Sequence, residues 1–85
     1  MLSDRLDQRL LAVMLQGDLT PTVSVVGVES GFEIHVERAG KTYKLETQRR
    51  SVRTFKSPTT ALKWLAEIGV DNVRFIGLKR WAGKK

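Results

Sequence analysis

Residues 22–45 read TVSVVGVESGFEIHVERAGKTYKL, and apolar side chains recur along this stretch at every second position. The apolar set comprises Val23, Val25, Val28, Phe32, Ile34, Val36, Tyr43 and Leu45. A period of two is typical of strands that bury one face and leave the other in water. Because Ser30-Gly31 and Ala39-Gly40 supply turns between the runs, the stretch predicts a three-stranded antiparallel meander.

A helix is predicted to precede the meander. Ser3 is placed as its N-cap, and acidic residues follow in its first turn. Leu6, Leu10 and Met14 then recur at helical spacing, and Gly17 is expected to end the helix.

The second half of this predicted helix is apolar around most of its circumference. Residues 10–15 read LLAVML, and a helix that is apolar on all sides must be covered on more than one side. An 85-residue chain has little material for such cover. We therefore predict a homodimer contact through Leu11, Met14 and Leu15, with burial in the chain's own core as the alternative.

A second helix and a fourth strand are predicted after the meander. Ser57 is the expected N-cap, Pro58 takes the first helical position, and Gly69 ends the helix. Its buried face comprises Ala61, Leu62, Leu65 and Ile68. Val73 and Phe75 predict the last strand. The order α-β-β-β-α-β is typical of a two-layer α+β fold with its helices on one face, which we place in residues 1–78, followed by a basic tail over 79–85.

Charge is distributed very unevenly between the two halves of the chain. Residues 1–40 carry a net charge of −3, whereas residues 41–85 carry twelve Lys and Arg against three acidic residues, a net charge of +9. The overall charge of +6 therefore understates the local field. A concentrated basic surface attracts polyanions, and nucleic acid is the commonest of these.

Residue types that carry catalysis are scarce. The chain has no cysteine and one histidine, His35, so the sequence predicts no metal site, no cofactor and no enzyme. His35 alternates with Glu33 and Glu37 on the polar side of a predicted strand, which is typical of a solvated sheet face. Gly40-Lys41-Thr42 resembles the end of a phosphate-binding loop, but a strand follows it instead of the required helix.

Targeting signals are also not found in the sequence. The N-terminal residues 1–5 lack the basic region and the apolar stretch of a signal peptide. The longest apolar run, residues 10–15, is too short to cross a bilayer. We therefore expect a cytoplasmic protein.

The segment from Gln48 to Val70 resembles a family of small proteins. A basic turn leads into RTFKS at residues 53–57 and then into the helix that contains ALKWL at 61–65. This pattern is similar to that of partition-associated, ParC-like proteins of bacterial plasmids, over residues 30–77. The resemblance implies a plasmid-borne accessory protein that binds DNA, and it implies no chemistry.

Two weaker resemblances concern the mode of binding. The meander followed by a capped helix is similar to the integrase-arm type of sheet-and-helix DNA-binding domain, which reads DNA with its sheet. Glu33 and Glu37 depart from such a surface. The order of elements is also similar to that of double-stranded RNA-binding domains, although Pro58-Thr59-Thr60 replaces their Lys-rich helix start.

Together these patterns predict a protein that binds double-stranded DNA mainly through phosphates and the minor groove, in plasmid maintenance or transcriptional control. The first expected contacts lie on a mobile, Arg-rich loop between the third strand and the second helix, and further contacts lie nearby and in the tail. They are Arg49, Arg50 and Arg53 on the loop, Lys41, Lys44 and Lys56 beside it, and Lys79, Arg80, Lys84 and Lys85 in the tail. A protein-binding module that docks an acidic partner is the alternative, and RNA binding is the third possibility.

Overall fold

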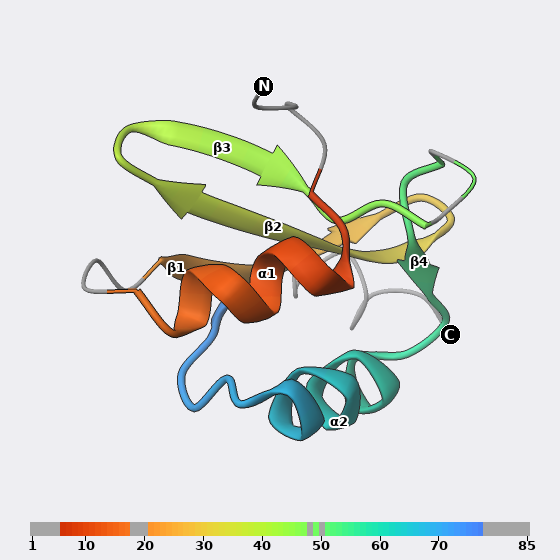
Figure 1. Ribbon diagram of the computed structural model, residues 1–85. Coiled ribbons are helices and arrows are strands. Elements are labelled where there is room, and N and C mark those ends of the chain that lie inside the picture. The colour runs from red at the N-terminus through yellow and green to blue at the C-terminus, as the bar shows by residue number, and fades with distance from the viewer. Residues whose placement is uncertain (1–5, 18–20, 48, 50, 78–85) are drawn as a thin grey trace.

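The computed structural model describes residues 6–17, 21–47, 49 and 51–77, and within these it has two helices and five strands (Figure 1). The elements are α1 (Gln8–Leu15), β1 (Thr22–Val28), β2 (Gly31–Arg38), β3 (Lys41–Lys44), β4 (Thr54–Phe55), α2 (Pro58–Ile68) and β5 (Arg74–Ile76). The strands form one mixed sheet in the order β3-β2-β1-β5, and β4 pairs with β2. The predicted α+β class is confirmed.

The predicted meander is present, because β1, β2 and β3 pair in sequence as antiparallel neighbours. Val25 lies opposite Ile34, and Val36 lies opposite Tyr43, so these four side chains share one face. Val25, Ile34 and Val36 are completely buried on that face. Val28, predicted with them, lies opposite Gly31 on the other face and is only partly buried. Except at Val28, the alternating pattern therefore predicted both the pairing and the inward face.

Two features of the sheet were not predicted. β4 pairs Thr54 and Phe55 with β2, beyond the end of β3. β5 runs parallel to β1, with Phe75 opposite Val25, and α2 connects β4 to β5. A two-residue strand is too short to show an alternating pattern, and the order of strands in a sheet is decided by tertiary packing.

α2 begins and ends where the sequence predicts. The Ser57 side chain accepts a hydrogen bond of 3.2 Å from the Thr60 backbone N–H, and Pro58 follows in the first turn. Gly69 ends the helix in the left-handed conformation with φ of 106°. Ala61 and Leu65 are buried against the sheet.

α1 begins later than predicted. Asp7 is its N-cap, and the Asp7 carboxylate accepts a hydrogen bond of 2.9 Å from the Leu10 backbone N–H. Leu6 is not helical, because it forms a bridge beside Leu45 and its carbonyl accepts a hydrogen bond of 2.7 Å from Glu46. The predicted cap, Ser3, lies outside the described residues.

The apolar residues of α1 serve the core of the chain itself, which corrects the predicted dimer contact. Leu11 and Met14 are buried, and Leu15 packs partly buried against the same core. Val13, with an exposed fraction of 61%, is the residue of this helix that projects apolar surface into solvent. Leu11 and Met14 are therefore unavailable to a second copy while the chain is folded.

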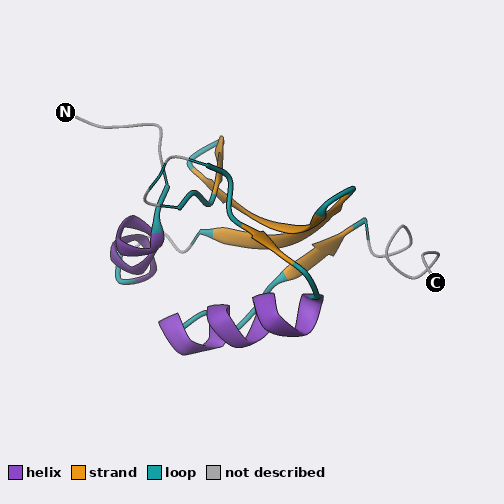
Figure 2. Cartoon of the chain, turned by 90° about the vertical axis from the view of Figure 1, so that its right-hand side faces the viewer, coloured by secondary structure: helices purple, strands orange, loops and turns teal. Residues whose placement is uncertain are grey.

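The two helices pack on the same side of the sheet (Figure 2). Side chains of α1 and α2 join the inward residues of β1 and β2 in a single apolar cluster. The opposite sheet face carries the polar positions of β2, as predicted from their alternation. Neither helix in the described part of the chain is long and apolar enough to span a membrane.

Candidate functional site

The described residues of the connection between β3 and β4, 45–47, 49 and 51–53, are joined by backbone hydrogen bonds, and we call this segment the basic hairpin. At its base the Arg53 N–H donates a hydrogen bond of 2.8 Å to the Leu45 carbonyl. Closer to its tip the Thr47 N–H donates a hydrogen bond of 2.8 Å to the Ser51 carbonyl. The described backbone of this segment is therefore hydrogen-bonded across the turn, and its predicted mobility stays a prediction.

The tip of the basic hairpin presents a cation to solvent. Arg49 is exposed there, and its backbone N–H donates a hydrogen bond of 3.2 Å to the Thr47 hydroxyl. A threonine at the start of a turn commonly accepts such a bond two residues later, which fixes the local backbone. Gln48 and Arg50, the second predicted contact of this tip, lie outside the described residues.

Arg53 has a different environment from Arg49. Its guanidinium carbon lies 5.0 Å from the centre of the Phe55 ring and 5.1 Å from the centre of the Trp64 ring. The two rings are 5.9 Å apart and tilted by 51°. A cation over aromatic faces at this range is attracted by the ring quadrupoles. Arg53 is therefore half-buried and joins the hairpin to β4 and α2.

The other predicted cations of the described chain surround this hairpin in sequence. Lys41, Lys44 and Lys56 are exposed, and the Lys41 ammonium lies 5.6 Å from the centre of the Tyr43 ring. The predicted tail contacts, Lys79, Arg80, Lys84 and Lys85, lie outside the described residues.

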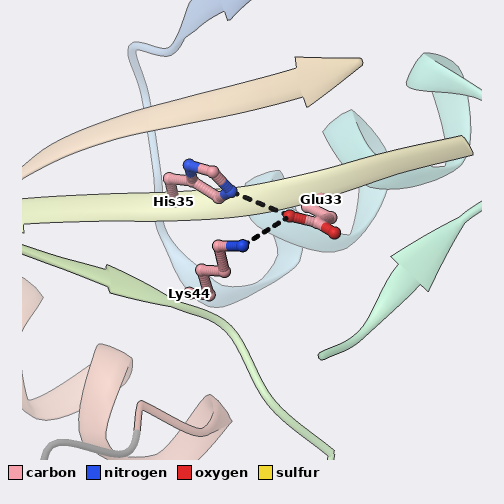
Figure 3. Close-up of polar contacts among 3 residues, drawn as sticks. All are labelled: Glu33, His35 and Lys44. Carbon is pink, nitrogen blue, oxygen red and sulfur yellow. Dashed lines mark hydrogen bonds and ion pairs between the residues drawn. The ribbon is translucent and has the colours of Figure 1, made fainter. Parts of the chain in front are cut away.

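Three polar side chains meet on the sheet face opposite the two helices (Figure 3). Glu33 accepts a hydrogen bond of 2.9 Å from the His35 ring, and the Lys44 ammonium lies 3.8 Å from the same carboxylate oxygen. Glu33 therefore has a cation beside it, which reduces the negative charge that this face presents. Among the described residues no group of His, Asp and Glu could hold a metal ion.

A cleft of about 640 Å³ lies between the start of α1 and the base of the basic hairpin. It is lined by Asp7, Gln8, Arg9, Ala12, Glu46, Thr47 and Arg53. Two carboxylates and two guanidinium groups face one space, so the cleft has no dominant charge. It does not favour a phosphate as a ligand.

Two residues that shape the hairpin had no predicted role in binding. Thr47 fixes the tip, and Trp64 supports Arg53. One signal for the stack exists in the sequence. Arg53 and Phe55 are two residues apart, and residues at this spacing share one side of an extended segment. Nothing in the local pattern points to Trp64 as the third member.

Comparisons with protein-family profiles, with curated proteins and with solved structures find no match to this chain. The resemblance to partition-associated proteins of plasmids therefore stays a prediction.

Proposed function

We propose that the protein binds double-stranded DNA through the basic hairpin and the cations around it. The observation that carries the proposal is a hydrogen-bonded hairpin with exposed Arg49 at its tip, within the half of the chain that has a net charge of +9. Neutralisation of phosphates by Lys and Arg supplies most of the affinity of such surfaces.

The distribution of exposed charge supports a phosphate-directed mode. Exposed cations occur on β3, on the hairpin, before and within α2, and on β5: Lys41, Lys44, Arg49, Lys56, Lys63 and Arg74. The exposed residues of α2 include Thr59, Lys63 and Glu67, which is not the row of Asn, Gln and Arg that reads bases in the major groove. Sequence selectivity should therefore be weak.

The cellular role that fits this activity is plasmid maintenance or transcriptional control in the cytoplasm of a bacterium. It is suggested by the resemblance of residues 30–77 to plasmid-encoded proteins. An arginine at the tip of a narrow hairpin suits a narrow minor groove, where the negative potential is greatest.

The test is the affinity for a random duplex across a salt series. With about four to six phosphate contacts, log K against log salt should have a slope near −4 to −5. Replacing Arg49 and Arg50 by Ala should weaken binding by about 2 kcal/mol or more without loss of the fold. A slope near zero would overturn the proposal. Duplex RNA and single strands in the same assay decide between DNA and RNA as the preferred ligand.

A protein partner with an acidic surface is the second candidate. It is favoured by Phe75 and Ile76, which are adjacent on β5 and have exposed fractions of 39% and 48%. The two side chains point to opposite faces of the strand, and exposed apolar side chains are more typical of protein contacts than of phosphate contacts. Such a partner would bind with little dependence on added duplex DNA.

A further inference from the structure

We infer that Arg53 is a positioning residue, which holds the basic hairpin against α2 so that the tip is presented in one orientation. Its guanidinium acts through the rings of Phe55 and Trp64 and makes no direct contact with phosphate. The inference rests on the proposed function for its effect on DNA, and it also predicts a property of the free protein.

The surroundings of Arg53 argue against a phosphate contact. Its guanidinium carbon lies 5.0 Å from the centre of the Phe55 ring and 5.1 Å from the centre of the Trp64 ring. The remaining side chain lines the cleft in which Asp7 and Glu46 also lie. Because Arg9 lines this cleft as well, the cleft has no dominant charge that would attract a phosphate to Arg53, whereas Arg49 is exposed at the tip.

Backbone hydrogen bonds and a side-chain contact join the hairpin to the rest of the fold. Its base is held by backbone hydrogen bonds, from Arg53 to Leu45 at 2.8 Å and from Glu46 to Leu6 at 2.7 Å. Closer to its tip, hydrogen bonds join Thr47 to Ser51 and Arg49 to Thr47 within the hairpin itself. The stack of Arg53 on Trp64 is a side-chain link from the hairpin to α2, and it sets the direction of the tip.

Orientation matters for affinity because ordering a loop on binding costs free energy. A tip that is already fixed loses less conformational freedom when it meets DNA. Loss of the contact between Arg53 and the Trp64 ring, which is the contact that reaches α2, should release the tip and weaken duplex binding roughly tenfold. The number of neutralised phosphates would not change, so the salt slope should stay the same.

Trp64→Leu tests this directly, because it removes the ring and retains every cation. We expect roughly tenfold weaker binding with an unchanged salt slope, and near-normal binding in the matched control Trp64→Phe. Arg53→Met should behave like Trp64→Leu, and Arg53→Lys should recover part of the affinity. Arg49→Ala, by contrast, should make the salt slope less negative by about 0.9, the value for one lost phosphate contact. A similar change of slope in Arg53→Met would overturn the inference.

A second measurement needs no DNA. The ¹⁵N order parameters of the Thr47, Arg49 and Ser51 amides should fall from about 0.85 to below about 0.6 in Trp64→Leu, while those of Val25 and Ile34 stay unchanged. Rigid hairpin amides in that variant would show the inference to be wrong, even if DNA binding is proven. Absence of DNA binding by the unmodified protein would overturn the proposed function, and the order parameters would still decide the role of Arg53. If Trp64→Leu does not fold, both measurements are made on Arg53→Met instead. This variant is expected to fold because the Arg53 side chain is only half-buried.

Discussion

The two edges of the sheet differ in chemistry. On the edge formed by β3 and β4, Lys41 and Lys44 are exposed and the basic hairpin lies between the strands. On the opposite edge, β5 exposes Phe75 and Ile76 with one cation, Arg74. Lysines on an edge oppose pairing with other strands and attract anions, whereas apolar side chains do neither. The edge formed by β3 and β4 is therefore suited to a polyanion, and the β5 edge is suited to a protein.

The two edges resemble each other in how their last strands are attached. β4 has two residues and β5 has three, so each has few backbone hydrogen bonds. A glycine of the neighbouring strand lies close to each: Gly31 of β2 lies close to Phe55 of β4, and Gly27 of β1 lies close to Gly77, the residue after β5. Short edge strands limit unwanted pairing, and here close backbone contacts compensate for their length.

The largest effect is expected for Gly31→Ala, at the β4 edge. An added Cβ would collide with the Phe55 carbonyl oxygen, and Gly31 has a φ of 140°, a conformation that side chains rarely adopt. Overpacking and backbone strain together should lower the free energy of unfolding by about 3 kcal/mol or more. Urea unfolding measures this change.

Gly40→Ala in the turn between β2 and β3 is the matched control for Gly31→Ala. Gly40 also has a positive φ, 78°, but no atom lies within 4 Å of an added Cβ. Gly40→Ala should lower the free energy of unfolding by only about 1 kcal/mol, because it adds backbone strain without a collision. Equal losses in both variants would mean that the contact with β4 contributes nothing to stability.

A smaller loss is expected for Gly27→Ala, at the β5 edge. An added Cβ would lie 2.7 Å from the Gly77 carbonyl oxygen, so β5 must move away from β1. The expected cost is about 2 kcal/mol, because Gly27 has an ordinary φ and only the overpacking term applies. A loss larger than that of Gly31→Ala would show that the β5 edge is the more tightly built of the two.

The two helices show which parts of this fold the sequence could predict. α2 has its start and end signals, Ser57, Pro58 and Gly69, at the correct positions, and no other element competes for those residues. α1 was placed too early because Leu6 fits a helical pattern as well as the core. Leu6 instead forms a bridge with Leu45, a residue far away in sequence, and this tertiary contact overrides the local signal.

The candidate site was predictable in composition and less so in geometry. The basic side chains between Lys41 and Lys56 are evident from the sequence, and their exposure follows from their charge. The hydrogen bonds that fold the hairpin join backbone groups, so side-chain types alone give little indication of them. The stack of Arg53 on Trp64 depends on how α2 packs beneath β4, which no local pattern specifies.

The edges can be compared for DNA binding with a matched pair of cations. Lys44 and Arg74 lie opposite His35 and Ser24, at the two ends of one row across the sheet face opposite the two helices. Lys44→Ala should weaken duplex binding by about 1 kcal/mol, since it also leaves Glu33 with less compensation. Arg74→Ala should have less than half of that effect. Equal losses in a filter-binding titration would extend the DNA site across the whole face.

The smallest effect is expected for Ile76→Lys, which gives the β5 edge the lysine that the β3 edge already has. Nearly half of the Ile76 side chain is exposed, so the substitution removes little buried apolar area. If this edge is free in solution, the free energy of unfolding should change by less than about 0.5 kcal/mol, and the sedimentation coefficient should not change. The predicted homodimer no longer has Leu11 and Met14 as its contact, since both lie in the core of the chain. If the unmodified protein is a dimer that dissociates in Ile76→Lys but not in Arg74→Ala, the dimer contact lies on the apolar edge. Ile76 would then be exposed in the single chain and buried in the dimer.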